Sequence, residues 1–222
     1  DRRNKSAAHA RIANRCRDLF RPIFLRFKLK IFNAIVRQHH DVARLLQRQF
    51  NAVEPNQKWV TDVTEFNVRG EKLYLSPIMD LFNGEIIAYQ TQRRPTFSLV
   101  KQMLDHALIK LQPHETPLLH SDQGWQYQMR YYQHALKQRG LTISMSRKGN
   151  CLDNAPMESF FGTLKTERLY HYRFTTREQA RQVVFEYIEV FYNRIRRHAK
   201  IGNQIPIDFA QQFYVSRQQP AA

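Results

Sequence analysis

The stretch "SRKGNCLDNAPMESFFGTLKTE", residues 146–167, contains the segment that decides the fold, a helix with two different faces. The helix is expected to begin near Asn154, directly after a basic turn. Its apolar side consists of Met157, Phe160, Phe161 and Leu164. Glu158, Gly162 and Lys165 follow one another at steps of four and three residues, so they share one face of the helix. This segment can pack on a core and still present a carboxylate and an ammonium group to a partner.

The residues before this helix alternate between strand patterns and helical patterns. Three strand-like runs with close turns, "KWVTDVTEF", "KLYLSPIMDLF" and "GEIIAYQTQ", predict an antiparallel meander. A helical pattern over 96–111, a short strand "PLLHSD", a helix that stops at Gly140 and a strand "LTISMS" come next. This order predicts an α/β fold, with a mixed sheet flanked by helices.

A long helix is predicted after residue 174, over "TTREQARQVVFEYIEVFYNRIRRH". Thr175 and Glu178 form a possible capping box at its start. Its predicted apolar face consists of Ala180, Val183, Val184, Tyr187, Ile188, Phe191 and Ile195. The basic residues at its expected C-terminal end offset the helix dipole, and they could also follow a DNA backbone.

The composition favours a polyanionic partner. The 222-residue chain has 35 Lys and Arg against 19 Asp and Glu, a net charge of +16, which is typical of nucleic-acid-binding proteins, although a ribosomal or membrane-surface protein would look similar. Residues 1–50 are especially basic and are expected to form an arm that is helical or partly disordered. Cys16 and Cys151 make neither a disulfide framework nor a C-x-x-C zinc pattern, which favours a reducing cytosol. The sequence contains no apolar run of about 18 residues that would predict a membrane span.

Three carboxylates could meet at one end of the predicted sheet. Asp62 lies within the first strand, where Asp is disfavoured, Asp122 follows the fourth strand, and Glu158 lies near the helix start. Acids at the ends of neighbouring strands, about 4.8 Å apart, can share Mg²⁺, which prefers oxygen ligands and substrate phosphates. Spacing alone leaves alternatives open among 19 acidic residues. Asp122 could cap a helix, and Glu158 could be a surface acid near a helix N-terminus.

Three motifs resemble the catalytic segments of insertion-element transposases whose core is similar to retroviral integrases: "WVTDVTEF", "HSDQGWQYQ" and the stretch quoted first. They look most like the orfB-type transposase of copy-out-paste-in insertion sequences. As in that family, 35 residues separate Asp122 from Glu158, and a basic residue, Lys165, comes seven after the Glu. The resemblance implies a ribonuclease-H-like core over 51–200, preceded by the basic N-terminal extension over 1–50 and followed by a tail over 201–222.

The resemblance also implies a chemistry and a set of partners. Asp62, Asp122 and Glu158 would form a DDE site that binds two Mg²⁺ or Mn²⁺ ions for DNA cleavage and strand transfer. The expected partners are DNA, further copies of the chain on that DNA, and an upstream-frame helix-turn-helix protein or fusion, in the bacterial cytoplasm at the nucleoid. The expected DNA-binding residues are Lys165, Arg147, Lys148, Asn154, Arg194, Arg196 and Arg197.

Two other functions remain open from the sequence. A ribonuclease-H-like nuclease would cleave DNA without joining it. A truncated or catalytically impaired remnant would only bind DNA, and residues 1–36 and the tail segment "KIGNQIPIDFA" do depart from the family pattern. Trp59 and Trp125, which flank the two Asp motifs, are predicted to pack in the core, although Trp125 could stack on a base.

Overall fold

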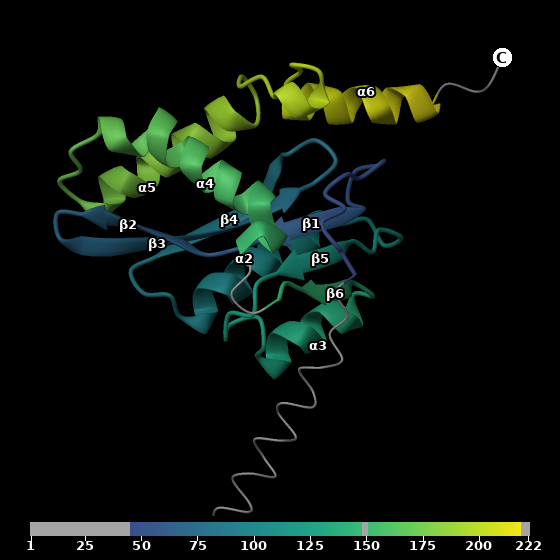
Figure 1. Ribbon diagram of the computed structural model, residues 1–222, viewed down its shortest axis with the longest axis horizontal. Coiled ribbons are helices and arrows are strands. Elements are labelled where there is room, and N and C mark those ends of the chain that lie inside the picture. Colours follow the sequence, from purple (N-terminus) through teal and green to yellow (C-terminus); the bar gives the residue numbers. More distant parts are fainter. Residues whose placement is uncertain (1–44, 148–150, 219–222) are drawn as a thin grey trace, which may run out of the picture. The chain divides into compact units, whose positions relative to one another are not determined.

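A computed structural model of the chain describes residues 45–147 and 151–218 (Figure 1). The predicted basic arm therefore lies almost entirely outside the described residues, and Lys148 lies outside them as well. Arg44–Ala222 form one compact unit. Among the residues that the structure describes, no helix is long and apolar enough to cross a membrane.

A six-stranded mixed sheet forms the centre of this unit, as the sequence predicts. The strands are β1 (Lys58–Thr61), β2 (Thr64–Val68), β3 (Glu71–Asp80), β4 (Ile86–Gln92), β5 (Leu118–Ser121) and β6 (Thr142–Met145). β1 and β2 both pair with β3 in antiparallel fashion, and β4 pairs with the other edge of β3. β5 and β6 continue the sheet from β1 as parallel strands. The predicted meander is confirmed, and the parallel half brings the ends of β1 and β5 to the same edge.

The predicted first strand is divided into β1 and β2 by a short interruption. Thr61 faces Ile78 and Thr64 faces Leu75, so the register against β3 continues unchanged across the break. The two residues in the break include Asp62, which is thus freed from the regular ladder of hydrogen bonds. The interruption gives this carboxylate its position at the end of β1.

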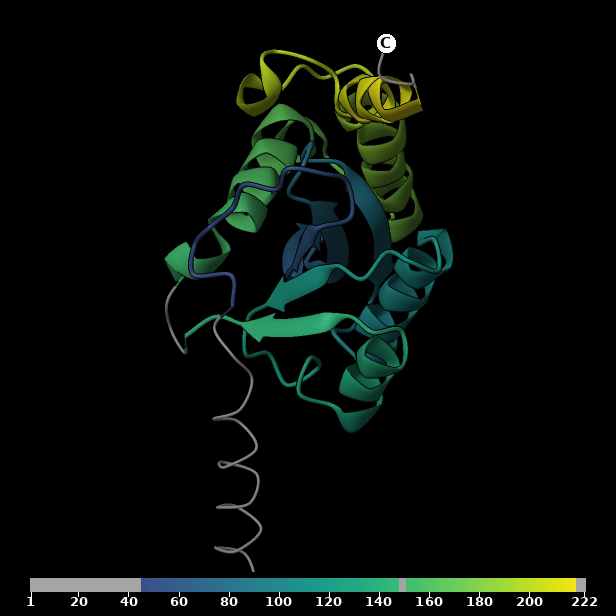
Figure 2. The ribbon, with the colours of Figure 1, turned by 90° about the vertical axis from the view of Figure 1, so that its right-hand side faces the viewer.

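Helices cover both faces of the sheet (Figures 1 and 2). They are α2 (Phe97–Lys110), α3 (Arg130–Gln138), α4 (Ala155–Glu167), α5 (Arg177–Phe185) and α6 (Pro206–Gln218), with short 3-10 turns at Cys151–Asn154, Leu169–His171 and Ala199–Ile201. α4 and α5 lie over one face and α2 and α3 over the other. The predicted apolar stripe of α4 is buried in the main core, together with Val60, Leu73 and Leu75 of the sheet.

The end of α3 confirms the predicted stop at Gly140. This glycine has a φ of +74°, which is costly for residues with a Cβ. Its N–H donates to the Lys137 carbonyl at 3.0 Å, and the Leu141 N–H donates to the Leu136 carbonyl at 2.9 Å. These two bonds form a Schellman motif, which turns the chain from α3 into β6.

The predicted long helix after residue 174 is wrong in its start, its geometry and its end. The N-cap is Thr176, whose hydroxyl accepts the Gln179 N–H at 3.1 Å, so the capping contact lies one residue later than expected. From Glu186 to Tyr192 the chain is a π-helix, η3. The helix ends there, so the arginines predicted for its last turn follow it in an irregular segment.

Asn193 provides a physical reason for the π-helix. Its side-chain oxygen accepts the Ile86 N–H and its amide donates to the Ile86 carbonyl, both at 3.0 Å, like an extra strand residue beside β4. Asn193 N–H donates five residues back, to Ile188, at 3.1 Å. The wider turn buries Tyr187, Ile188 and Tyr192 and leaves Phe191 and Ile195 40% and 55% exposed, so the predicted apolar face is wrong at these last two positions.

The C-terminal segment packs through aromatic side chains. Phe82, which follows β3, lies 5.0 Å from Phe209 and 5.1 Å from Phe213 of α6, measured between ring centroids. The segment expected to be a tail thus contains a helix in contact with the turn that follows β3. The predicted domain boundary at residue 200 remains a prediction.

Candidate active site

The two aspartates of the predicted site lie side by side at the end of two parallel strands. Trp59 pairs with Leu119 and Val60 with His120, so Asp62 and Asp122 each lie two residues beyond the same pair. Residues related in this way share a face of the sheet. Both side chains are half-buried. The parallel arrangement of β1 and β5 is therefore what brings these carboxylates together.

The third carboxylate comes from the start of α4. Glu158 lies in the first turn of this helix and is exposed. The helix is tied to the sheet by Asn154, whose side-chain amide donates to the Thr61 carbonyl at 3.1 Å, directly beside Asp62. Asn154 is only 4% exposed. It positions the helix start in this structure, and its predicted contact with DNA remains a prediction.

Electrostatic coupling links the three acids. The pKa of Asp62 is raised to about 7, first by burial and then by the negative charge of Asp122, with a smaller contribution from Glu158. The Val63 N–H donates to Asp62 Oδ1 at 2.7 Å and partly opposes this shift. Within the described residues, no three His, Cys, Asp or Glu side chains are already arranged as a metal site. The structure therefore shows interacting carboxylates, while their role as metal ligands remains a prediction.

Gly124 lies beside Asp122, and the sequence alone did not reveal why a glycine occupies this position. Its N–H donates to Asp122 Oδ1 at 2.8 Å. A Cβ at this position would lie 2.9 Å from the same oxygen and 3.3 Å from the ring of Tyr127. The φ of Gly124 is not positive, so its backbone conformation does not require a glycine. The glycine is required by the space beside the carboxylate.

The basic turn before α4 is held by an acid from the same segment. Asp153 accepts hydrogen bonds from Arg48 Nε at 2.8 Å and from Arg147 Nε at 3.2 Å. These arginines, with the Arg147 hydrogen bond as the largest cause, hold the pKa of Asp153 well below its usual range. Asp153 lies in the 3-10 turn just before the helix. The contact of Arg147 with DNA remains a prediction.

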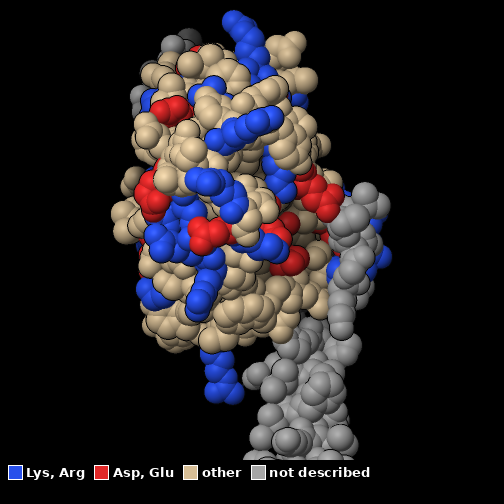
Figure 3. Space-filling model, turned by 90° about the vertical axis from the view of Figure 1, so that its left-hand side faces the viewer, with Lys and Arg blue, Asp and Glu red and all other residues tan. Residues whose placement is uncertain are grey.

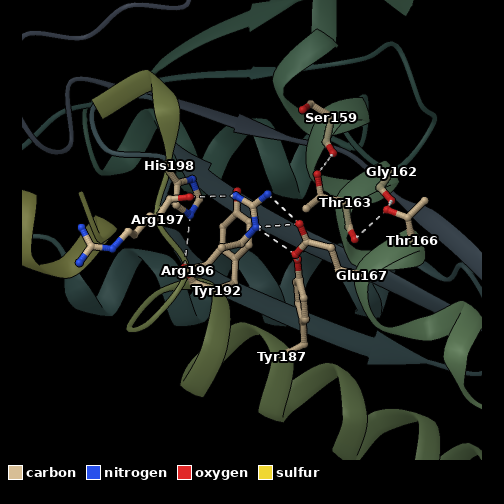
Figure 4. Close-up of polar contacts among 10 residues, drawn as sticks. All are labelled: Ser159, Gly162, Thr163, Thr166, Glu167, Tyr187, Tyr192, Arg196, Arg197 and His198. Atoms are coloured by element: carbon tan, nitrogen blue, oxygen red, sulfur yellow. Dashed lines mark hydrogen bonds and ion pairs between the residues drawn. The ribbon is translucent and has the colours of Figure 1, made fainter. Parts of the chain in front are cut away.

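The arginines after η3 differ from one another in their partners. Arg196 forms a two-pronged ion pair with Glu167 of α4, with the shortest N–O distance 2.8 Å (Figure 4). Arg194 Nε donates to the Glu189 carbonyl at 3.0 Å, and Arg197 Nη1 donates to the Asn203 carbonyl at 3.2 Å. Their predicted DNA contacts remain predictions.

Basic side chains also gather at the β2–β3 end of the core, with acidic side chains among them (Figure 3). The ion pairs of this region are Lys72–Glu65, Arg177–Glu71, Arg93–Glu178 and Arg181–Glu178. Such exposed pairs contribute little to stability. Lys165 of α4 is half-buried, and its charge contributes to the lowered pKa of Glu65, whose main cause is Lys72. Lys165 therefore interacts electrostatically with this end of the sheet.

The two tryptophans of the motifs have different environments. Trp59 is completely buried, as predicted. Trp125, three residues after Asp122, is 53% exposed, so the prediction that it packs in the core is wrong. Because this ring is exposed, base stacking remains the open interpretation of Trp125.

Two family models, both described as integrase core domain, match residues 52–151 and 158–213. The InsK protein of insertion sequence element IS150 from Escherichia coli (strain K12) is 56% identical over 173 residues, which are 78% of this chain and 61% of that protein. An uncharacterized transposase-like protein of Haemophilus influenzae is 51% identical over 78% of this chain and 79% of its own length. The transposase for insertion sequence element IS904 of Lactococcus lactis is 38% identical over 83% of this chain and 72% of its own length.

Solved structures show the same fold. A chain of the simian T-cell lymphotropic virus intasome matches with a TM-score of 0.59 and 21% identity, over 77% of this chain and 58% of that one. The HTLV-2 integrase catalytic core domain, in complex with magnesium, matches with a TM-score of 0.55 and 16% identity, over 72% of this chain and 99% of that one. These matches confirm the predicted ribonuclease-H-like mixed sheet. Together with the sequence relatives, they show that the chain belongs to the family of insertion-element transposases with an integrase core domain.

Proposed function

We propose that this chain cleaves phosphodiester bonds at the ends of an insertion element and joins the freed ends to DNA. The observation that carries this proposal is the pair Asp62 and Asp122 at the end of two parallel strands, coupled electrostatically to Glu158. Family membership supports it, as does the net charge of +16, because a DNA substrate is a polyanion. In the proposed chemistry no side chain forms a covalent intermediate with the DNA. Water, and then a DNA 3′-hydroxyl, would attack the phosphorus.

The donor set fits a divalent cation. Val63 and Gly124 each hold one oxygen of their aspartate through a backbone N–H, which leaves the second oxygen of Asp62 and of Asp122 as a possible ligand. Hard carboxylate oxygens are the ligands that Mg²⁺ and Mn²⁺ prefer. Two such ions, when bound, stabilise the charge on the attacking and leaving oxygens of an in-line displacement. A cation would also relieve the repulsion that raises the pKa of Asp62.

The residues of α4 would bind and orient the DNA beside these carboxylates. Lys165 lies two turns after Glu158 on the same face and can pair with a phosphate. Gly162 lies between them, and a Cβ there would meet no atom within 4 Å. The helix surface between Glu158 and Lys165 is thus open to a close approach by a DNA backbone.

A branched oligonucleotide that mimics a joined product tests the chemistry without end recognition. Strand transfer exchanges one phosphodiester for another, so the reverse reaction is accessible, and we expect resealed and released strands to appear only with Mg²⁺ or Mn²⁺. Cleavage with no strand exchange would instead indicate a nuclease. Binding with no chemistry in either metal would indicate a DNA-binding remnant.

Metal binding should depend on pH through Asp62. Because its folded pKa of about 7 lies above the unfolded value, this group favours folding at low pH, and the contribution is lost as pH rises toward 7. A cation reverses this loss because it binds the deprotonated form. We expect Mg²⁺ at a test concentration of about 5 mM to raise the melting temperature by about 2 °C or more at pH 8, and by less at pH 5.5.

The variant Asp62→Asn provides the control for this pH dependence. Asp80 is also buried with a pKa raised to about 7, but it remains in the variant, so the difference between the two proteins isolates Asp62. The variant should show little magnesium stabilisation at either pH. Equal stabilisation of both proteins would place the cation elsewhere.

Replacing Gly162 tests whether DNA approaches α4 closely. Gly162→Ala should stabilise the helix by about 0.5–1 kcal/mol, because alanine has the higher helix propensity and its methyl group meets no neighbour. The joining rate should nevertheless fall several-fold, because the methyl group would occupy the face that meets DNA. Thr163→Ala, one residue later and about 100° around the helix from Gly162, is the matched control and should keep its rate. A faster or unchanged rate in Gly162→Ala would place the DNA elsewhere.

A further inference from the structure

Glu167, the last residue of α4, accepts hydrogen bonds from two side chains that follow α5 in the sequence (Figure 4). Arg196 Nε lies 3.0 and 2.9 Å from its two carboxylate oxygens, and Arg196 Nη2 lies 2.8 Å from Oε1. The Tyr187 hydroxyl of η3 donates to Oε2 at 2.8 Å. Both oxygens are therefore occupied, and we refer to Glu167, Tyr187 and Arg196 as the α4 latch.

The α4 latch is more buried and more constrained in its geometry than an ordinary surface ion pair. The Arg196 and Glu167 side chains are 26% and 35% exposed, and the pair is bidentate, which fixes its geometry. The Arg196 guanidinium also lies 5.8 Å from the centroid of the Tyr192 ring. His198 packs edge to face against the same ring, with centroids 4.7 Å apart. Arg196 is thus held by a carboxylate and by packing.

The two neighbouring arginines lack this arrangement. Arg194 and Arg197 are exposed and donate to backbone carbonyls, and neither forms an ion pair with any described residue. They retain donors that a phosphate can use. Arg196, by contrast, would have to break its hydrogen bonds with Glu167 before it could bind DNA.

The α4 latch holds the end of the helix that carries two proposed site residues, Glu158 and Lys165. Asn154 fixes the start of α4 on β1, and the latch fixes its end. At a rise of about 1.5 Å per residue, Glu158 lies roughly 13 Å and Lys165 roughly 3 Å along the helix from Glu167. Release of the end would therefore move Lys165 more than Glu158. A displacement of about 1 Å can reduce a reaction rate up to a hundredfold.

We infer that Arg196 is a positioning residue that, through Glu167, holds α4 so that Lys165 and Glu158 meet the DNA and the cations. The inference rests on the proposed function, because it assumes that this face of α4 meets DNA. It assigns Arg196 a role different from the DNA contact that the sequence predicts for it. Arg194 and Arg197 remain the candidates for that contact.

The experiment compares Arg196→Gln with Arg197→Gln in the full chain. For each variant we would measure the joining rate on the branched oligonucleotide and the salt dependence of its binding to duplex DNA. A lost phosphate contact lowers the slope of log affinity against log salt concentration by about 0.9. We expect Arg197→Gln to show this smaller slope. Arg196→Gln should keep the wild-type slope and lose about tenfold or more in rate.

Two further variants separate positioning from a loss of folding. Tyr187→Phe removes one hydrogen bond of the latch and keeps the ring, and it should lower the rate without a change in slope. The charge exchange Glu167→Arg with Arg196→Glu should recover part of the rate that either single change loses. Amide hydrogen exchange without DNA should be faster at the end of α4 in Arg196→Gln, a readout independent of activity.

The outcomes distinguish the latch from the proposed function. A wild-type chain with no strand exchange would overturn the proposed function, whereas the hydrogen-exchange result would still test the latch. An active wild type with a reduced salt slope in Arg196→Gln would make Arg196 a DNA contact and overturn the inference. An unchanged rate in Arg196→Gln or Glu167→Gln would overturn it as well.

Discussion

Asp122→Asn should abolish strand cleavage and joining while the chain remains folded and bound to DNA. The amide is nearly isosteric, and its Oδ1 can still accept the Gly124 N–H, so the turn after β5 should be preserved. A neutral amide is a poor ligand for Mg²⁺, and it no longer balances the charge of two cations. We expect the rate on the branched oligonucleotide to fall on the order of 10³-fold, since metal ions contribute several kcal/mol to such reactions.

The control for this variant is an acid outside the site. Asp105 of α2 forms an exposed ion pair with Lys101, four residues earlier, at 2.6 Å. Asp105→Asn makes the same chemical change and should alter the rate by less than about twofold, because exposed pairs are worth little. DNA affinity should be unchanged in both variants, because phosphate contacts dominate it. A residual rate in Asp122→Asn close to that of Asp105→Asn would refute the assignment of the site.

Local patterns predicted those parts of the fold that depend on local chemistry. The stop of α3 at Gly140 requires a left-handed residue, and the apolar stripe of α4 follows the helical period, so both are visible in the sequence. The approach of Asp62 to Asp122 is less local. It depends on a parallel pairing of β1 with β5, which the sequence order suggests but spacing alone does not fix. The resemblance to a known family is what singled out Asp62 and Asp122 among the acidic residues of the chain.

Long-range side-chain pairing explains what the sequence could not predict. The 3.6-residue pattern continues through residues 186–195, yet the amide of Asn193 pairs with Ile86, 107 residues earlier, and η3 adopts a wider turn. Arg196 looked like a helix-end cation because its partner Glu167 lies 29 residues away. Trp125 is 53% exposed, which its apolar character alone would not indicate.

Gly124→Ala should reduce activity strongly by displacing the proposed catalytic carboxylate of Asp122 without removing it. The new Cβ would lie 2.9 Å from Asp122 Oδ1, 3.2 Å from Gln126 Oε1 and 3.3 Å from Tyr127 Cδ2. Tyr127 is 1% exposed and packs against Tyr132 with ring centroids 5.4 Å apart, so it cannot yield easily. Gln126 is also buried. The half-buried Asp122 carboxylate is the neighbour with the most freedom to move, so it would shift from its present position.

The rate of Gly124→Ala should fall by on the order of 10²-fold, the loss expected from a misplacement of about 1 Å. Overpacking should also cost roughly 1–3 kcal/mol of stability. Val100→Ala, a truncation at a fully buried position of α2, also destabilises the chain but leaves the site intact, so it should retain its rate at a temperature where both variants are folded. Titration with Mn²⁺ provides the decisive measurement. A displaced ligand raises the concentration required for half-maximal activity, whereas a purely structural defect lowers the active fraction at an unchanged midpoint. An unchanged midpoint in Gly124→Ala would mean that the carboxylate of Asp122 does not depend on the space beside this glycine.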